Sequence, residues 1–441
     1  MESGNSASRM KSFFNLLFLL FAALSLPRAW LRARREPAYR GMFRRRSQPP
    51  ELAPRRPCLW INGVSVGEIA SAQPLAAEFE RLYPGIRLVF SCTTGTGFAR
   101  ASTLYGARHD VIGYPFDWSF TVAAFLEAVR PDAVIMMELD LWPNFLLACR
   151  ARGVPVVVAG GRISARSARG YGWVQPLLKA PLQAVRLFLA QDDVDAERAL
   201  RGLGLPTEKV KVGGNLKFDI ALAPGSKLPG FLPQFKGQGR LLVLASTHDP
   251  EEDLLLKALG DLGWPNRRYG DWRLAIAPRH PERAGALLRG IAARGLRPVL
   301  FSAAENGENV EGGVLLVDRI GVLSSLYTLA DLCFIGGSLI PHGGQNMIEP
   351  AAHGVAVMFG PYAHNFREAV SVLLEAKAAV QVRGGPEEFE ERLSELLQNA
   401  TLRRDLGDRA RAAVSARRGA AKCAAEAVRE LLVGAGPDAP T

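Results

Sequence analysis

Acidic side chains directly after apolar runs are the first candidates for chemistry in this sequence. Glu68 stands in the turn between the apolar run at 59–62 and an amphipathic pattern that begins near Ile69. A carboxylate at this place commonly complements the dipole of the following helix. It can also act as a general base toward the hydroxyl of an acceptor. The residues around Glu68 leave both roles open.

Two further acids and one lysine occupy similar places. Glu138 and Asp140 follow the apolar run at 133–137, and Lys217 lies in the stretch 215–219. Two carboxylates invite a divalent cation, but further ligand candidates are missing nearby. Structural capping of the next segment is the alternative. A lone lysine such as Lys217 is usually solvated, although here it is expected near the edge of a binding cleft.

The second half of the chain carries residues suited to a nucleotide. Pro278 and Arg279 follow a predicted strand, where a guanidinium can bind phosphate. The segment from Gly336 to Pro350 combines glycines with a predicted helix start, which favours close approach of a phosphate. Within it, Glu349 could accept both hydroxyls of a ribose. Turn formation explains the glycines but not the whole series of residues from Gly336 to Pro350 in this order.

Several common site types are disfavoured. The sequence has no G-x-x-x-x-G-K-[ST] loop, no G-x-G-x-x-G after the first strand and no H-E-x-x-H motif. Its five cysteines form no C-x-x-C pair, and the histidine spacing fits no zinc pattern. These absences weigh against NTPase, dehydrogenase and zinc-protease functions, and the cysteine usage indicates a reducing compartment.

The elements that position these residues follow a βα rhythm. The chain has 441 residues, of which 48% are hydrophobic and 22% charged, a balance typical of globular α/β proteins. Short apolar runs alternate with helical patterns, which predicts parallel sheets. The predicted strands are 59–62, 87–91, 133–137, 154–159 and 187–190, then 241–245, 273–277, 314–317, 332–335 and 355–359. We expect two Rossmann-like doubly wound domains facing across a cleft, with ligands at the carboxyl ends of the strands.

The composition also predicts domain boundaries. Residues 221–239 are rich in proline and glycine and lack helical periodicity, so we interpret them as a linker. The first domain then spans 57–220 and the second 240–441, which ends in helices over 387–432. We expect the first domain to bind the acceptor and the second to bind the nucleotide.

Residues 1–56 predict a membrane anchor with a basic segment. The apolar run 13–26 precedes the segment 28–56, which holds ten arginines against two glutamates, a local charge of +8 within a net charge of +11. A helix over 12–26 either spans the bilayer marginally or lies in its interface. A cleaved signal peptide competes, but the arginines directly downstream oppose translocation. We expect an uncleaved anchor whose arginines bind anionic lipid phosphates from the cytoplasmic side.

Taken in order, these segments closely resemble the 3-deoxy-D-manno-octulosonic acid (Kdo) transferases of lipopolysaccharide synthesis. The resemblance covers roughly residues 28–430, and the combination is far more specific than any single motif. The segments that carry it are 65–68, Glu138 with 141–144, Arg162 with Ser164, Arg166 and Ser167, then 215–219, 246–248, 278–283 and 336–350.

The resemblance implies a membrane-associated GT-B enzyme at the cytoplasmic face of the inner membrane. Such an enzyme moves Kdo from CMP-Kdo to a lipid A precursor of the lipid IVA type, with inversion and without a required metal or other cofactor. It implies that Glu68 is the catalytic base and that Glu138 and Lys217 stabilise the transition state. The implied CMP contacts are Pro278, Arg279, Ile320, Gly321, Val322, Asn346, Met347, Ile348 and Glu349.

The chain departs from the pattern of the resembled family at several positions. The family usually has His at Asn62, Glu at Asp140 and His at Gln345, and it has Asp-Thr-x-Gly-Glu over 318–322, where this chain has Arg319 and Val322 in place of Thr and Glu. Val322 cannot supply a carboxylate, and Asp140 retains the charge with a shorter reach. Two other functions compete with the Kdo transferase. One is another GT-B glycosyltransferase or epimerase that uses a UDP-sugar, and the other is a membrane-anchored basic scaffold or nucleic-acid binder. We expect no nucleic-acid partner.

Overall fold

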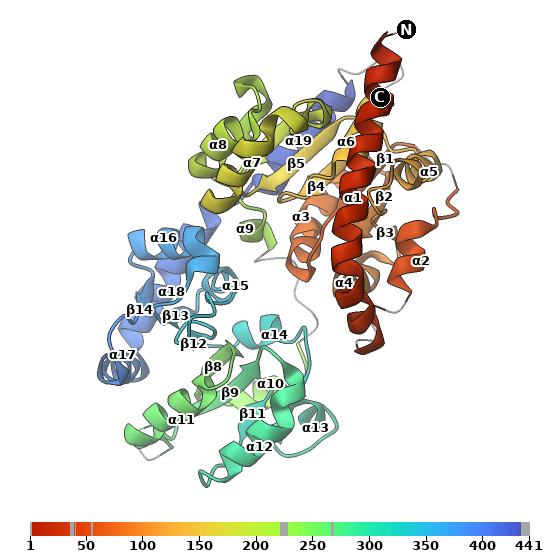
Figure 1. The fold of residues 1–441 in the computed structure, drawn as a ribbon. Helices are drawn as coiled ribbons and strands as arrows, with labels where there is room; N and C mark the ends of the chain where they lie inside the picture. Colours follow the sequence, from red (N-terminus) through yellow and green to blue (C-terminus); the bar gives the residue numbers. More distant parts are fainter. Residues whose placement is uncertain are drawn as a thin grey trace. The chain divides into compact units, whose positions relative to one another are not determined.

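The structure is a computed structural model that describes residues 2–35, 39, 41–53, 56–220, 228–265 and 269–433. The described residues divide into two compact units (Figure 1). The first combines residues from Met1–Ile220 and Arg418–Thr441, and the second comes from Ala221–Arg417. Each unit is built around a parallel sheet, which confirms the predicted α/β class.

The first unit contains a seven-stranded parallel sheet in the order β3-β2-β1-β4-β5-β6-β7. The strands are β1 Cys58–Asn62, β2 Arg87–Cys92, β3 Asp110–Gly113, β4 Ala133–Met137, β5 Val156–Gly161, β6 Val185–Ala190 and β7 Val210–Val212. Strands β1, β2, β4 and β5 are buried at every residue, as expected for parallel strands covered on both faces. Alternate side chains enter the two cores, so Trp60 packs with Phe145 on one face and Ile61 with Phe79 on the other.

The helices of the first unit cover both faces of this sheet. They are α1 Glu2–Arg35, α2 Met42–Ser47, α3 Val66–Leu82, α4 Gly95–Tyr105, α5 Ser119–Val129, α6 Pro143–Ala151, α7 Ala165–Leu178, α8 Asp193–Arg198, α9 Lys217–Ile220 and α19 Ala420–Val433. Short turns of 3₁₀ or π type lie at Pro181–Ala184, Ala199–Leu203 and Thr207–Lys209.

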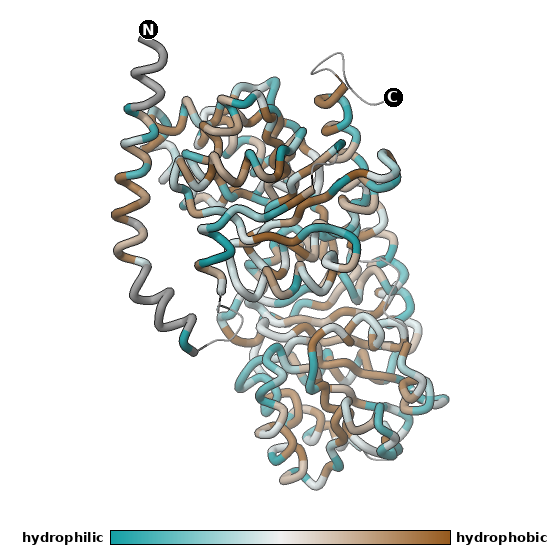
Figure 2. The backbone as a smooth tube through the Cα atoms, turned by 90° about the vertical axis from the view of Figure 1, so that its right-hand side faces the viewer, coloured by the Kyte–Doolittle hydropathy of each residue, from teal (hydrophilic) through white to brown (hydrophobic). Residues whose placement is uncertain are grey.

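Helix α1 docks on the first unit along one narrow face. Phe14 and Phe18 are buried, and the Phe18 ring lies 5.1 Å from the Trp118 ring and 6.0 Å from the Trp142 ring, centroid to centroid. Asn15 donates to Ser119 Oγ at 2.9 Å and accepts from the Ser119 amide at 3.0 Å. Other apolar side chains of α1 stay exposed. They are Phe13, Leu16, Leu17, Leu19, Leu20 and Leu24. In Figure 2, the brown colour of the backbone along part of this helix marks hydrophobic residues.

Two findings refine the predicted anchor at residues 1–56. Among the described residues, no helix is both long and apolar enough to cross a membrane. Helix α2, which carries part of the basic segment, packs against β3: Met42 is buried, and a Cβ on Gly113 would lie 2.7 Å from the Arg45 carbonyl oxygen. Residues 41–53 therefore fold as part of the first unit rather than as a separate basic segment.

The second unit contains another seven-stranded parallel sheet, in the order β10-β11-β9-β8-β12-β13-β14. The strands are β8 Arg240–Thr247, β9 Trp272–Pro278, β10 Pro298–Leu300, β11 Val314–Leu316, β12 Leu332–Ile335, β13 Ala356–Phe359 and β14 Ala379–Gln381. The helices are α10 Phe231–Lys236, α11 Glu251–Asp261, α12 Ala284–Ala292, α13 Phe301–Glu305, α14 Leu323–Tyr327, α15 Ile348–Ala352, α16 Arg367–Glu375, α17 Pro386–Gln398 and α18 Ala400–Ser415, with 3₁₀ turns at Pro281–Arg283 and His364–Phe366.

The structure divides the chain differently from the predicted boundaries. Part of the predicted linker 221–239 is helix α10, which buries Leu232 and Phe235 in the second unit, while 221–227 lie outside the described residues. Helix α19, predicted within the domain 240–441, belongs to the first unit. The reason is its apolar face, because Ala424 and Val428 join the core of the first sheet.

Candidate active site

Glu68 lies at the start of α3, beyond the carboxyl end of β1. The Ser65 hydroxyl caps the helix by accepting from the Glu68 amide at 3.2 Å. The Glu68 side chain turns back and accepts from the Val64 amide at 2.9 Å. This resembles a capping box, so the structural role considered for Glu68 is present. One carboxylate oxygen makes this bond, and a carboxylate can accept several more.

The surroundings of Glu68 tune its proton affinity. Desolvation of the half-buried carboxyl raises its pKa to about 7, and the nearby charges of Glu138 and Asp140 act in the same direction. The bonds from Val64 and Ser65 oppose the shift only in part. A carboxylate with a pKa near neutrality both accepts and releases a proton readily at physiological pH, which is the property of a general base.

Lys217 and Glu138 meet in the first unit, as an ion pair with 2.9 Å between Nζ and Oε1. Their side chains are 24% and 26% exposed, so both are partly withdrawn from water without being enclosed. Glu138 follows β4 and has a positive φ of 55°, a conformation uncommon outside glycine. Backbone strain of this kind is concentrated at functional sites. The lone solvated lysine considered from sequence is therefore a paired lysine.

The short helix α9 carries Lys217 and is tied to the C-terminal helix. The Asp219 carboxylate accepts from the amides of Gly419 at 2.7 Å and Ala421 at 2.8 Å, at the start of α19. Phe218, the residue after Lys217 in α9, is buried. The position of Lys217 thus depends on a segment about 200 residues later in the chain, a contact that local sequence patterns do not reveal.

Two departures from the resembled family pattern contact each other. Asn62 Nδ2 donates to Asp140 Oδ2 at 2.9 Å, and Trp142 Nε1 donates to Asp140 Oδ1 at 2.7 Å. Burial raises the pKa of Asp140, while these two bonds and the charge of Arg46 oppose the rise. The Trp142 ring also packs on Phe18, so the docked helix α1 touches the residue that orients Asp140.

The second unit gathers its predicted residues along one edge of its sheet. Pro278 ends β9, residues 320–322 follow β11, and residues 346–349 follow β12. In the sheet, β11 is next to β9, and β8 lies between β9 and β12. Because the strands are parallel, these loops share the carboxyl edge. Arg279 is exposed there, directly after β9. This is the edge where doubly wound sheets bind ligands.

Histidines accompany Arg279 at this edge. The His248 ring lies 4.0 Å from the His342 ring and 5.8 Å from the His280 ring, centroid to centroid. Desolvation lowers the pKa of His248 to about 4, with further lowering by the neighbouring His342, His280 and Arg279. Gln345, a third departure from the family pattern, contacts His248 Nε2 at 3.0 Å.

The glycine-rich segment does not offer all its amides to a ligand. The buried carboxylate of Glu251 accepts from the amides of Gly337 at 2.6 Å, Ser338 at 2.9 Å and Leu339 at 2.9 Å, and from His248 at 3.0 Å. These three amides are therefore not available to a ligand, because they donate to an internal anion, and phosphate binding at the helix start of the segment stays a prediction.

The other residues that are predicted to bind the nucleotide differ in how exposed their side chains are. Met347 and Ile348 bury their side chains, and Asn346 Oδ1 accepts from the Ile348 amide at 3.0 Å. Their predicted contacts must therefore be made by backbone atoms. Ile320 is 74% exposed, and Gly321 has a φ of 94° that favours glycine. Val322 caps α14 without a side-chain hydrogen bond, and Glu349 lies in the first turn of α15.

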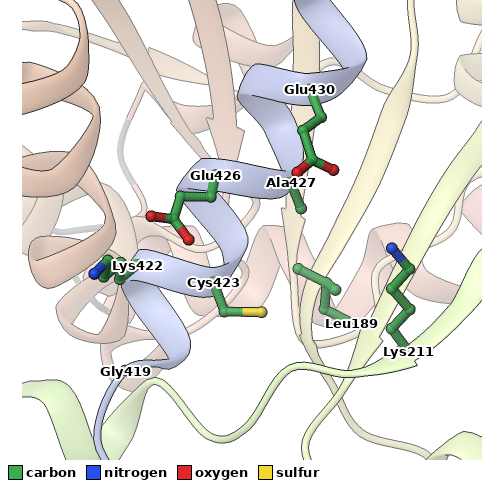
Figure 3. Close-up of a pocket in the computed structure, with 8 residues that line it drawn as sticks. All are labelled: Leu189, Lys211, Gly419, Lys422, Cys423, Glu426, Ala427 and Glu430. Carbon is green, nitrogen blue, oxygen red and sulfur yellow. The ribbon is translucent and has the colours of Figure 1, made fainter.

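A cavity of about 290 Å³ lies elsewhere in the first unit, between α19 and strands β6 and β7 (Figure 3). Lys211, Lys422, Glu426 and Glu430 give it mixed charge. Desolvation raises the pKa of the Cys423 thiol, which makes it a poor nucleophile. None of the predicted site residues lines this cavity.

Taken by itself, each unit carries groups suited to one task, proton transfer in the first unit and anion binding in the second. The first unit supplies a carboxyl with a pKa near 7 and a lysine–glutamate pair. The second supplies an exposed arginine at the carboxyl edge of its sheet. Among the described residues, no three histidine, cysteine or acidic side chains are grouped as metal ligands.

Comparison with solved structures identifies the fold. UDP-GlcNAc 2-epimerase from Neisseria meningitidis bound to UDP-GlcNAc aligns with a TM-score of 0.58 at 13% identity, covering 86% of this chain and 99% of that chain. A glycosyltransferase from Rickettsia africae aligns with a TM-score of 0.56 at 14% identity, covering 86% of this chain and 98% of that chain. At these identities the likeness shows a GT-B-like fold and nothing about substrates.

Sequence comparison goes further. The family described as 3-deoxy-D-manno-octulosonic-acid transferase (kdotransferase) matches residues 40–220. The chain is 32% identical over 418 residues to the 3-deoxy-D-manno-octulosonic acid transferase of Bordetella pertussis, covering 91% of this chain and 95% of that protein. It is 30% identical over 406 residues to the one of Haemophilus influenzae, covering 90% and 92%. The chain therefore belongs to the 3-deoxy-D-manno-octulosonic acid transferase family of glycosyltransferases.

Proposed function

We propose that this protein transfers Kdo from CMP-Kdo to a lipid A precursor of the lipid IVA type, with inversion at the anomeric carbon and with Glu68 as the general base. The observation that carries the proposal is the environment of Glu68. Its carboxyl stands at the carboxyl end of β1 with a pKa raised to about 7, close enough to Glu138 and Asp140 to feel their charges.

In the proposed step, the Glu68 carboxylate takes the proton of an acceptor sugar hydroxyl as the oxygen attacks the anomeric carbon of Kdo. The new glycosidic bond forms as the bond to the CMP phosphate oxygen breaks, and CMP leaves with the electron pair. Direct attack from the face opposite CMP inverts the configuration. A base whose pKa lies near the working pH suits this transfer.

Glu138 and Lys217 are proposed to stabilise the transition state. Their ion pair holds the ammonium group at a fixed place in the first unit, 2.9 Å from Oε1 of Glu138. Charge that develops as CMP departs is stabilised by a preorganised cation, because no rearrangement is needed during the step. The paired carboxylate orients the ammonium.

The second unit is proposed to bind the CMP part of the donor. Arg279 can form charge-assisted hydrogen bonds with the phosphate, and Glu349 can accept from the ribose hydroxyls. Backbone atoms of Pro278, of residues 320–322 and of residues 346–348 would complete the nucleotide site. We expect no metal or further cofactor, because the cationic side chains can balance the phosphate and the carboxylate of the donor.

Product analysis tests this function. Wild-type protein incubated with CMP-Kdo and a tetraacyl lipid A precursor should increase the acceptor mass by one or more Kdo residues and release CMP. Isothermal titration should show binding of CMP in preference to UMP and UDP. Preference for UDP, with no change of acceptor mass, would instead favour the UDP-sugar alternative.

We also propose that the protein acts at the cytoplasmic face of the inner membrane. The exposed apolar side chains of α1 can enter the lipid, while the docked face stays on the protein. The exposed Arg44 and Arg45 on α2 can add attraction to anionic headgroups. This attraction fades with ionic strength, whereas apolar burial does not.

A deletion separates these two contributions. A variant lacking residues 1–27 should bind anionic vesicles at low salt and leave them at about 0.5 M salt, where the Debye length is only a few ångströms. The full-length protein should stay bound because of apolar burial. Release of the full-length protein by the same salt would contradict anchoring by α1.

A further inference from the structure

Arg46 differs from the other arginines of the basic segment. Three arginines follow one another in α2, and Arg44 and Arg45 are exposed, whereas Arg46 is half-buried. Its guanidinium turns toward the carboxyl edge of the first sheet and lies 4.3 Å from the centre of the Phe116 ring. Desolvation lowers its pKa to about 10, opposed mainly by the charge of Asp140. Arg46 therefore remains a cation, at a place where charge is poorly hydrated.

The hydrogen bonds of Arg46 leave donors unused. Nε donates to the Tyr114 carbonyl at 2.8 Å, and Nη1 makes a long bond of 3.4 Å to the Thr93 carbonyl. A guanidinium has five N–H donors in a planar fork. Among the residues that the structure describes, no carboxylate lies within 4.0 Å of this guanidinium. Asp140 contributes charge nearby, but its two oxygens accept from Asn62 and Trp142.

A series of three hydrogen bonds links Arg46 to the proposed base. Arg46 bonds to the carbonyl of Thr93, and the hydroxyl of the next residue, Thr94, donates to the Val64 carbonyl at 2.8 Å. The amide of Val64 in turn donates to the Glu68 carboxylate at 2.9 Å. The guanidinium and the base thus lie at the ends of the adjacent strands β1 and β2. The Thr93 hydroxyl is also buried there without a hydrogen-bond partner.

We infer that Arg46 binds an anionic group of the acceptor, a phosphate ester, next to the hydroxyl that Glu68 deprotonates. The inference rests on the proposed function and adds a specificity determinant to it. A guanidinium fork matches two phosphate oxygens, and a phosphate would give Arg46 the direct ion-pair partner that it does not find among the described residues. Because Arg46 and Glu68 are held in one unit by the contacts above, a phosphate on Arg46 would position the acceptor relative to the base.

The test uses full-length protein and pairs changes in the enzyme with changes in the acceptor. Arg46→Lys keeps the charge but loses the fork, and Arg46→Ala loses both. Arg44→Ala controls for general attraction to anionic lipid, since Arg44 is exposed on the same helix and is proposed to attract headgroups rather than to bind the acceptor phosphate. Each variant is assayed with a phosphorylated tetraacyl glucosamine disaccharide and with the same disaccharide after phosphatase treatment, while thermal melting reports folding.

We expect Arg46→Ala to raise the KM for the phosphorylated acceptor by about 10- to 100-fold, the usual effect of losing a charged hydrogen-bonded pair. Arg46→Lys should raise it less, and neither change should alter the KM for CMP-Kdo. The preference of the wild type for the phosphorylated acceptor should largely disappear in Arg46→Ala and persist in Arg44→Ala.

Three results would overturn the inference. One is an unchanged acceptor KM in well-folded Arg46→Lys and Arg46→Ala proteins. Another is an increase in the KM for CMP-Kdo alone, which would place an anion of the donor on Arg46. The third is an equal loss of the preference for the phosphorylated acceptor in Arg44→Ala and Arg46→Ala, together with weaker vesicle binding. That result would show that Arg46 contributes only to general attraction to anionic lipid.

A binding measurement keeps the inference separate from the proposed function. If the wild type fails to transfer Kdo at all, the proposed function fails, but intrinsic tryptophan fluorescence can still report binding of the two disaccharides in detergent micelles. Tighter binding of the phosphorylated form that depends on Arg46 would support the inference on its own. Equal binding of both forms would contradict it.

Discussion

The carboxyl edges of the two sheets share a topology but use their charged residues differently. In the first unit, Glu68 and the Lys217–Glu138 pair are half-buried and keep hydrogen-bonding capacity in reserve. In the second unit, Glu251 is buried and its carboxylate holds four backbone amides. One edge holds charge available for a reaction, and the other uses charge to fix a loop.

This difference shows how one architecture can serve two tasks. The desolvated carboxyl of Glu68 is less stable when ionised, and the resulting raised pKa suits the proposed role of general base. The carboxylate of Glu251 is stabilised by its amides and fixes the backbone of 337–339, next to the proposed CMP residues. Rigid placement suits a site that must hold a donor in one pose.

Replacing Lys217 should produce the largest effect on the first edge. Lys217→Ala should lower kcat by about 100-fold or more, the size seen when a preorganised donor to the transition state is removed. Folding should change little, since the pair is partly exposed. Steady-state kinetics with saturating donor measures this. Lys211→Ala, an exposed lysine of the same unit, is the control and should behave as wild type. Equal turnover in both variants would show that Lys217 does not contribute to the transfer step.

Replacing Glu349 tests the second edge. Glu349→Ala should weaken CMP binding by about 1 to 3 kcal/mol, as a charged acceptor for ribose hydroxyls is lost. Isothermal titration of CMP gives the value directly. Glu387→Ala is the control because Glu387 also lies in the first turn of a helix, α17, without a proposed ligand. If both variants lose only stability and neither loses CMP affinity, Glu349 serves its helix alone.

Asp219 tests whether the pair on the first edge needs its distant support. Asp219→Ala should lower kcat by about tenfold, because α9 loses two amide contacts to α19 and Lys217 is held less firmly. The acceptor KM and CMP binding should stay near wild type, and Asp219→Asn should recover part of the loss. The control is Asp192→Ala, which removes the cap of α8 in the same unit. A loss of kcat as large in Asp192→Ala would indicate general destabilisation rather than positioning.

The smallest expected effect is on thermal stability, which the raised pKa of Glu68 lowers at high pH. The pKa of folded Glu68 is about 7 against an ordinary value of 4.5 for glutamate, so the folded state binds more protons between these values. The stability contributed by Glu68 is therefore present at low pH and is lost as pH rises toward about 7. Glu68→Gln should melt at a slightly higher temperature than wild type at about pH 8 and should show no such gain near about pH 4. Melting curves at both pH values check this, and a lower melting temperature at the higher pH would argue against the raised pKa.

The sequence predicted the central strands well and the sheet edges poorly. All ten predicted strands are present, and two of them, at 133–137 and 332–335, have the predicted bounds. The four strands without a prediction are β3, β7, β10 and β14, which are the outer strands of the two sheets. A central parallel strand is buried on both faces and therefore reads as a continuous apolar run, whereas an outer strand such as β7 is short and half exposed.

The site residues also differ in whether the sequence could predict them. Glu68, Glu138 and Lys217 were accessible to prediction because each directly follows a strand or precedes a boundary, and the family resemblance assigned their roles. Arg46 was missed because composition grouped it with nine other arginines, and only the packing of α2 on β3 separates it. The contact of Asp219 with α19 joins residues far apart in the chain, which no local pattern encodes.

The most direct test of the central claim is the single-turnover rate of Kdo transfer in Glu68→Gln, measured with CMP-Kdo and the tetraacyl lipid A precursor. Glutamine keeps the size of the side chain and can still accept from the Val64 amide, so the fold at the start of α3 should persist. The account predicts a rate at least about 100-fold below wild type, with an unchanged dissociation constant for CMP. A variant that binds CMP normally and transfers Kdo at close to the wild-type rate would contradict the role of Glu68 as the base.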